Sequence, residues 1–423
     1  MENNKSVKKI YLDNAATTPT DAEVFEAMKP YFSEKFGNAS SAHQFGREAR
    51  EAIENARKQT ADFFGCEPKE IIFTSCATES NNLAIKGVIK SVNSKQLTDN
   101  KNPHIITSAI EHHCVLHACE ALERDGLAEV TYLSVNKEGL VEIESVEKAI
   151  KDNTVLVSIM YANNEIGTIQ PVKEIGEVIK KINQERFKLQ ASSFKIYFHV
   201  DAVQAVNYLN CNVNYLNADL VSVSAHKFYG PKGVGALYIR KGTPIMKIQD
   251  GGEQEFKLRS GTHNTPGIVG IGAAIQQATK NKEQIIERIL KLRNKLIDDV
   301  LGKIPNSKLN GSGEKRLPNN ANFSFPGAEG EAILLALDLE GIAVSTGSAC
   351  ASENLNPSHV LMALGLGPED AHSSIRFTLG KHTTEKDIDR VLEVLPGVIE
   401  RLRKISGAGA GEAKKKLPDD FGC

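Results

Sequence analysis

Residues 220–233 read Leu220-Val-Ser-Val-Ser-Ala-His-Lys-Phe-Tyr-Gly-Pro-Lys-Gly. A short β-prone run therefore leads into a loop rich in glycine and proline, and Lys227 stands where the strand ends. A lysine in such a place can lie in a cleft, where desolvation lowers the pKa of its amine and leaves a nucleophile that forms a Schiff base with an aldehyde. The competing interpretation is a solvated loop lysine, because charged side chains are mostly exposed.

Strand-like and helix-like patterns alternate on both sides of this stretch. Further strands are predicted to begin at Ile71, His104, Val155, Lys195 and Gly233, and helices to span 79–92, 111–124 and 172–183. Such alternation predicts an α/β domain whose sheet is mostly parallel and lies between helices. Ligands of such sheets bind at the carboxyl ends of the strands.

A second, smaller α/β domain is predicted towards the C-terminus. Apolar residues between Ile285 and Val300 recur at steps of three and four, which predicts one long helix over 272–300 that contains the domain boundary. We assign residues 18–280 to the large domain, residues 1–17 and 281–405 to the small domain, and residues 406–423 to a flexible tail of low complexity.

Composition limits the class of protein. The 423 residues include 41% hydrophobic and 25% charged residues, which excludes wholesale disorder. The 51 basic and 53 acidic residues give a net charge of −2, so we expect no direct binding to nucleic acid and none to a membrane. The seven cysteines include no Cys-x-x-Cys pair, and the N-terminus has no apolar signal segment. These features predict reduced thiols and a cytoplasmic protein.

Asp201 ends the run Tyr197-Phe-His-Val-Asp, just before the strand that leads to Lys227. The two side chains can therefore lie on adjacent strand ends. Pyridoxal phosphate needs a lysine that binds its aldehyde and a carboxylate that keeps its ring nitrogen protonated. A helix cap is the alternative for Asp201.

The stretch Phe73-Thr-Ser-Cys-Ala-Thr-Glu joins a strand to a helix start. Free backbone amides there, together with the hydroxyl of Thr78, suit a phosphate group. An ordinary capped helix start is the alternative.

Together these three segments resemble the fold-type I pyridoxal-phosphate enzymes, and specifically the group I cysteine desulfurases of the NifS and IscS kind, within the class V aminotransferase family. The resemblance runs from Tyr11 to about Arg403. It includes the stretches Phe36-Gly-Asn-Ala-Ser-Ser, Asn163-Asn-Glu-Ile-Gly, Arg259-Ser-Gly-Thr, Ser345-Thr-Gly-Ser-Ala-Cys and Ala371-His-Ser-Ser-Ile-Arg-Phe.

The resemblance implies how the cofactor would be held. Lys227 would carry pyridoxal 5'-phosphate, Asp201 would pair with the ring nitrogen, and Gln204 and Asn164 would lie at the ring hydroxyl. The phosphate would be bound by Ala77, Thr78, Ser224 and His226. Thr262 would reach the phosphate of a neighbouring subunit, which implies a homodimer.

The resemblance also implies residues for the substrate, L-cysteine. His112 would stack on the cofactor and shuttle protons, which suits an imidazole with an ordinary pKa of about 6.5. Arg376 would bind the substrate carboxylate, with Asn38 assisting, although an ordinary ion pair is the alternative for Arg376. A metal site is the rival interpretation of the neighbourhood of His112, formed by His113, His117, Cys114 and Cys119; we predict no metal.

Cys350, in a loop of small residues, decides the implied reaction. It would take the substrate's sulfur as a persulfide and release L-alanine. The sulfur would then pass to an iron–sulfur scaffold or another acceptor protein, where Cys350 would transiently contact the partner's cluster, or to a tRNA-thiolation relay. The alternative is a small buried cysteine, which we prefer for Cys66, Cys76, Cys114, Cys119 and Cys211.

The chain departs from the family pattern at several places. Cys76 stands where the family usually has glycine, residues 94–102 and 184–193 look like surface insertions, and the tail with Cys423 differs from the segment that engages the scaffold. The rival functions are a selenocysteine lyase or other pyridoxal-phosphate-dependent transferase, and a scaffold without catalytic activity.

Overall fold

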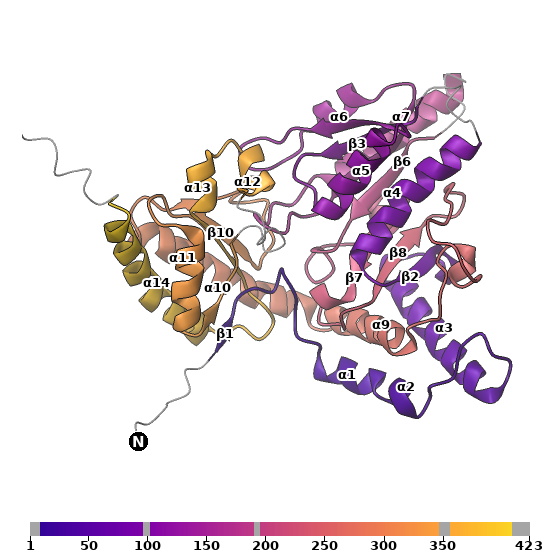
Figure 1. The fold of residues 1–423 in the computed structure, drawn as a ribbon, viewed down its shortest axis with the longest axis horizontal. Helices are drawn as coiled ribbons and strands as arrows, with labels where there is room; N and C mark the ends of the chain where they lie inside the picture. Colours follow the sequence, from indigo (N-terminus) through magenta and orange to yellow (C-terminus); the bar gives the residue numbers. More distant parts are fainter. Residues whose placement is uncertain (1–8, 96–101, 190–194, 347–355, 408–423) are drawn as a thin grey trace, which may run out of the picture.

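A computed structural model describes residues 9–95, 102–189, 195–346 and 356–407 of the chain. These residues form a larger and a smaller body that lie side by side (Figure 1). The larger body has a mostly parallel sheet between helices, which confirms the predicted α/β fold class.

The larger body is built on seven strands: β2 Ile71–Thr74, β3 His104–Ser108, β4 Glu129–Leu133, β5 Thr154–Met160, β6 Tyr197–Asp201, β7 Leu220–Ser224 and β8 Gly235–Ile239. Their order is β2-β8-β7-β6-β5-β3-β4, and among these strands β8 alone runs in the opposite direction to the other six. Every residue of β5 is buried, as expected for a central strand with helices on both faces of the sheet.

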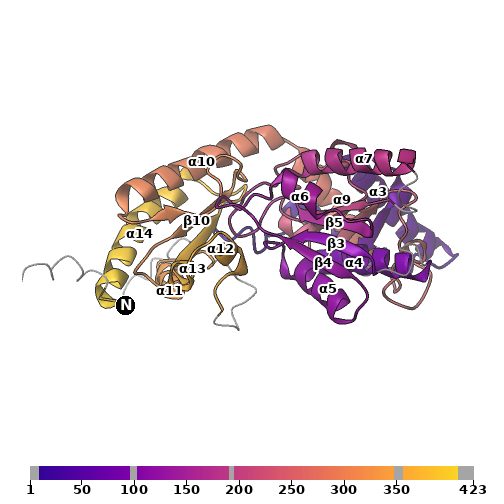
Figure 2. The same cartoon turned by 90° about the horizontal axis from the view of Figure 1, so that it is seen from above.

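Helices cover both faces of this sheet. They are α1 Ala22–Met28, α2 Pro30–Ser33, α3 Gln44–Phe64, α4 Ala77–Ser94, α5 His113–Arg124, α6 Ile143–Ala149, α7 Val172–Leu189, α8 Val213–Leu216 and α9 Thr265–Thr279, with short turns η1 Pro68–Glu70, η2 Ala225–Lys227 and η3 Glu255–Lys257. The side chains of α4 and α5 pack in one apolar core, and those of α3, α7 and α9 pack in another on the opposite face (Figure 2).

The smaller body combines the C-terminal part of the chain with its first described residues. Its elements are β1 Ile10–Tyr11, α10 Lys282–Lys303, β9 Lys308–Leu309, β10 Asn320–Ser324, α11 Gly330–Leu339, β11 Ile342–Ala343, α12 His359–Ala363, α13 Pro368–His372, β12 Ser374–Thr378 and α14 Glu385–Ile405. Strand β1 pairs in parallel with β11, and Leu12 is buried in the core beneath α10 and α14. The domain boundaries given above stay a prediction.

The structure corrects the predicted helix over 272–300. The chain instead forms α9 and α10, separated at Lys280 and Asn281. Lys280 has an extended backbone, and Asn281 has a φ of 52°, in the left-handed region that asparagine tolerates better than most residues. The apolar repeat from Ile285 to Val300 is real, but it belongs to α10 alone, which enters the smaller body (Figure 2).

Three other predicted segments lie partly or mostly outside the described residues. Most of the insertion predicted at 94–102 and the tail from residue 408 lie outside them. The predicted insertion at 184–193 begins as a continuation of α7, which is helical as far as Leu189. Among the described helices, none combines the length and the apolar character that crossing a membrane requires.

Candidate active site

A cavity of about 400 Å³ lies at the carboxyl ends of the parallel strands. The segments that follow β2, β3, β5, β6 and β7 contribute to its wall, as the topology of the sheet predicts for a ligand site. The structure brings together most of the predicted site residues here: Ala77, Thr78, His112, Asn164, Asp201, Gln204, Ser224, His226, Lys227 and Arg376.

Lys227 lines this cavity from η2, directly after β7. Its amine donates hydrogen bonds to the carbonyl oxygens of Ala15, at 2.6 Å, and Ala16, at 2.7 Å. The side chain of Gln204 donates to the same oxygen of Ala15, at 3.0 Å. Because the amine is held in the cavity, the interpretation of Lys227 as a solvated loop lysine is wrong.

Asp201 ends β6, which pairs with β7 in the sheet. Its carboxylate accepts hydrogen bonds from the amide nitrogen of Asn81, at 2.7 Å, and from the backbone N–H of Val203, at 3.0 Å. Burial raises the pKa of Asp201, while these hydrogen bonds and the charge of Lys227 act in the opposite direction. A buried carboxylate beside a lysine is the pair of groups that a pyridinium ring needs.

His112 lines the cavity at the start of α5 and caps that helix. Its Nδ1 accepts a hydrogen bond from the backbone N–H of Cys114, at 3.2 Å. Burial, together with the nearby Lys227, His113 and His117, lowers the pKa of His112 to about 4. The ring is therefore neutral near pH 7, and because Nδ1 accepts, its proton is on Nε2.

The start of α4 offers backbone amides to an anion. Cys76 precedes the helix with an extended backbone, and within the described residues its side chain makes no capping hydrogen bond. Ala77 and Thr78 in the first turn line the cavity together with Ser224 and His226. Burial lowers the pKa of His226 to about 4, with Lys227 adding to the effect. This arrangement suits a phosphate group, since amides at a helix start attract anions.

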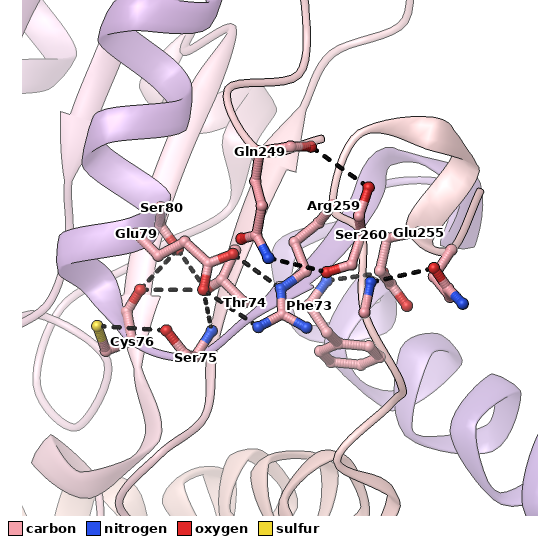
Figure 3. Close-up of polar contacts among 12 residues, drawn as sticks. Phe73, Thr74, Ser75, Cys76, Glu79, Ser80, Gln249, Glu255, Arg259 and Ser260 are labelled. Carbon is pink, nitrogen blue, oxygen red and sulfur yellow. Dashed lines mark hydrogen bonds and ion pairs between the residues drawn. The ribbon is translucent and has the colours of Figure 1, made fainter. Parts of the chain in front are cut away.

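The loop over 249–262 braces this helix start (Figure 3). Arg259 Nε donates to Glu79 Oε1 at 2.8 Å, and Glu79 Oε2 accepts from the backbone N–H of Ser75 at 2.7 Å. Ser260 in turn donates to the carbonyl oxygen of Gly252 at 2.8 Å. The pair of Arg259 and Glu79 therefore fixes the turn between β2 and α4.

The same loop holds three consecutive non-glycine residues with left-handed backbones: φ is 46° at Glu255, 56° at Phe256 and 70° at Lys257. This conformation costs an L-residue roughly 1–2 kcal/mol, which exceeds the roughly 0.5–1 kcal/mol of folding entropy that a glycine loses. Lys257 is exposed, so its removal opens no cavity. We expect Lys257→Gly to raise the free energy of unfolding by about 0.5–1 kcal/mol in urea denaturation.

The control for this prediction is Lys137→Gly, at an exposed turn position that is not among the residues with positive φ. Without strain to relieve, this variant is expected to lose stability. A loss of stability in Lys257→Gly as well would contradict the prediction.

Arg376 is buried at the wall of the cavity, on β12. Its Nη2 donates to Asp13 Oδ1 at 2.7 Å, and its Nη1 donates to the carbonyl oxygen of Asn164 at 3.0 Å. Its Nε is buried without a hydrogen-bond partner in the described part of the chain. Arg376 thus forms an ion pair with Asp13, as the alternative interpretation of this residue predicts, but it also lines the cavity.

Two predicted residues do not line the cavity, and a third cannot be placed. Thr262 and Asn38 are both exposed and do not line it. The side-chain oxygen of Asn38 accepts a hydrogen bond from the backbone N–H of Ser40, at 2.9 Å. Cys350 lies outside the described residues.

The cavity also holds residues that the sequence analysis did not assign to the site. Glu165 is buried there and accepts a hydrogen bond from the hydroxyl of Ser358 at 2.5 Å. Burial raises the pKa of Glu165 to about 7, although Ser358 and Arg376 oppose the shift. His359 lines the cavity beside His113, with ring centroids 4.6 Å apart. In the sequence, the only feature that indicates a role for Glu165 in the site is its position next to Asn164. No feature of the sequence indicates such a role for His359.

The cysteines need a further correction. Cys119 and Cys211 are buried as predicted, but Cys66, Cys76 and Cys114 are only partly buried. Cys76 and Cys114 line the cavity, because they follow the ends of β2 and β3. In the described residues no group of three or more His, Cys, Asp or Glu side chains is arranged to hold a metal ion.

Comparisons with known proteins place this arrangement in a family. The family model for aminotransferase class-V matches residues 10–391. The cysteine desulfurase IscS of Dictyoglomus turgidum is 53% identical over 94% of this chain and 96% of its own length. The cysteine desulfurase IscS of Methanosarcina thermophila is 52% identical over 94% of both chains.

Solved structures agree with the sequence comparisons. A NifS-like protein superposes with a TM-score of 0.82 at 38% identity, covering 94% of this chain and 99% of its own. A structure of SspA in complex with cysteine superposes with a TM-score of 0.73 at 38% identity, covering 89% of this chain and 100% of its own. The chain therefore belongs to the class-V aminotransferase family and, within it, to the cysteine desulfurases of the IscS and NifS type.

Proposed function

We propose that this protein is a pyridoxal-phosphate-dependent sulfurtransferase that converts L-cysteine to L-alanine and keeps the sulfur as a persulfide on Cys350. The observation that carries the proposal is the convergence of Lys227, Asp201, His112 and Arg376 on one cavity at the carboxyl edge of the sheet. The relatives named cysteine desulfurase support the choice of substrate.

The residues of the cavity fit pyridoxal phosphate. The amides at the start of α4, with Thr78, Ser224 and His226, suit the phosphate, and Asp201 suits the ring nitrogen. Lys227 is the group that would hold the aldehyde. When bound, this cofactor supplies an electron-accepting ring that makes the α-proton of an amino acid acidic.

The other residues would act on the substrate. Arg376 would bind the carboxylate of L-cysteine through the part of its guanidinium that lines the cavity, and His112 would hold a proton at Nε2. The thiolate of Cys350 would attack the substrate's sulfur, so that a sulfur–sulfur bond forms while the carbon–sulfur bond breaks. The electron pair stays with the substrate carbon, which takes up a proton and leaves as alanine.

The persulfide would then pass to an acceptor protein, and we propose an iron–sulfur cluster scaffold in the cytoplasm. We also propose a homodimer. Two observations support it. Thr262 is exposed. On α1, α2, the start of α3 and the segment between α2 and α3, four phenylalanine side chains are each more than half exposed: Phe25 at 53%, Phe32 at 63%, Phe36 at 65% and Phe45 at 51%. Exposed apolar residues of this kind are typical of subunit interfaces.

The test of the function is Cys350→Ala. With L-cysteine and dithiothreitol, we expect the variant to release sulfide at least a hundredfold more slowly than the wild type, about 2.7 kcal/mol in activation free energy. The absorption of the bound cofactor should be retained, because Cys350 is not one of the proposed cofactor ligands. Sulfide and alanine are measured together.

The matched control is Cys423→Ala, which removes the terminal thiol of the tail. It is expected to keep the wild-type rate, since we propose no role for this cysteine. Undiminished sulfide release from Cys350→Ala would refute the persulfide assignment.

A further inference from the structure

Cys114 contacts His112 with its side chain as well as with its backbone. The Sγ of Cys114 lies 3.0 Å from Nδ1 of His112, and the amide nitrogen of Asn81 donates to this sulfur at 3.1 Å. Burial raises the pKa of Cys114 to about 12, and the charge of Asp201 adds to the shift. The group therefore remains a thiol near pH 7 and has one proton to donate.

The surrounding hydrogen bonds determine where this proton points. Asn81 is fully buried, and its amide nitrogen carries two protons. One proton is donated to Asp201 Oδ2 at 2.7 Å and the other to the sulfur of Cys114. Because Nδ1 of His112 accepts from the backbone N–H of Cys114, it carries no proton, so in the 3.0 Å contact between Sγ and Nδ1 the thiol is the donor. The chain of hydrogen bonds from Asn81 through Cys114 to His112 therefore has one direction.

We propose that Cys114 is a positioning residue for His112: oriented by Asn81, its thiol donates to Nδ1 and keeps the imidazole neutral with its proton on Nε2. His112 thus presents a hydrogen-bond donor, its Nε2–H, to the substrate. This consequence rests on the proposed function, whereas the hydrogen bonds do not. The backbone N–H of Cys114 donates to the same nitrogen, so the thiol strengthens a tautomer that the helix start already favours.

Other titratable groups face His112 and set the background against which Cys114 acts. They come from its own helix, from η2, from α12 and from β6: His113, His117, Lys227, His359 and Asp201. Three of these are imidazoles and one is a lysine, so most of them disfavour a second proton on His112. None of the five is changed by a substitution at position 114, which makes the contribution of the thiol separable.

The experiment compares three substitutions in the purified protein with its cofactor: Cys114→Ser keeps a donor, Cys114→Val fills the space without a donor, and Cys114→Ala does neither. The titration of His112 is followed by NMR with nitrogen-15-labelled histidine, and its signal is assigned with His112→Gln. We expect Cys114→Val and Cys114→Ala to raise the pKa of His112 by about one unit, because a hydrogen bond to the neutral form is lost. Cys114→Ser should titrate like the wild type.

The same variants are assayed for alanine formation from L-cysteine. The acid limb of the rate profile is expected to move up by about one pH unit in Cys114→Val and to stay in place in Cys114→Ser. A wild-type titration in Cys114→Val, or an equal shift in Cys114→Ser, would overturn the proposal. If the wild-type protein formed no alanine, the proposed function would be rejected. The NMR titration would still test the role of Cys114.

Discussion

Replacing Lys227 with alanine is expected to yield a protein without covalently bound cofactor, in which alanine formation from L-cysteine falls at least a thousandfold, about 4 kcal/mol in activation free energy. In the described part of the chain Lys227 is the only lysine that lines the cavity. The carbonyl oxygens of Ala15 and Ala16 hold its amine there, and among the described residues no second lysine lines the cavity that could take its place. The measurements are the absorption spectrum, its sensitivity to borohydride, and the rate.

Two further variants separate charge from chemistry. Lys227→Arg keeps a cation that can bind the same carbonyl oxygens, but a guanidinium stays protonated and is not a nucleophile. It is expected to fail as completely as Lys227→Ala. Lys232→Ala removes an exposed lysine from the same loop and should keep the rate within about twofold. A borohydride-sensitive spectrum in Lys227→Ala would rule out the role assigned to this residue.

The central part of the site could be predicted because it follows from strand order. In a parallel sheet, a residue at the carboxyl end of a strand lies at the edge where ligands bind, and this does not depend on the other elements of the fold. Asp201 and Ser224 end β6 and β7, which are neighbours in the sheet, and Lys227 follows at once. Local sequence was therefore enough to place these side chains together.

Contacts between distant segments could not be predicted in this way. The pairing of β1 with β11 and the ion pair of Asp13 with Arg376 join residues more than 300 positions apart. The hydrogen bonds from Asn81 to Asp201 and Cys114 depend on how α4 packs beside β6 and α5. The break at Asn281 is a local feature, but an apolar repeat at helical spacing does not reveal a single left-handed residue.

The buried ion pair of Arg57 and Glu255 supports the second large prediction. Both side chains are nearly inaccessible, at 3% and 2% exposure, and they form two hydrogen bonds of 2.8 Å. Glu255 also accepts from the backbone N–H of Phe73 and lies 2.9 Å from Nε2 of His263. This carboxylate therefore connects the loop over 249–262, which braces the start of α4, to α3 and β2.

Removing Arg57 leaves that carboxylate buried without its main partner, which typically costs about 3–5 kcal/mol. We expect Arg57→Ala to lose about this much free energy of unfolding at pH 7 in urea denaturation. Lys58→Ala, at the exposed neighbouring position on α3, is expected to change stability by less than about 0.5 kcal/mol. Equal stabilities of these two variants would contradict the argument.

The pH dependence gives an independent check of the same pair. Burial by itself would raise the pKa of Glu255, but hydrogen bonds from Arg57 and His263 outweigh it and lower the pKa to about 2. A carboxyl group with a depressed pKa stabilises the folded state above its unfolded pKa of about 4.3, and this contribution is lost as the pH falls towards 2. In Arg57→Ala burial dominates, so Glu255 destabilises the fold at neutral pH and less so once it is protonated. The stability difference between wild type and variant should therefore shrink on acidification from pH 7 to pH 3, whereas a difference caused only by lost packing would stay constant.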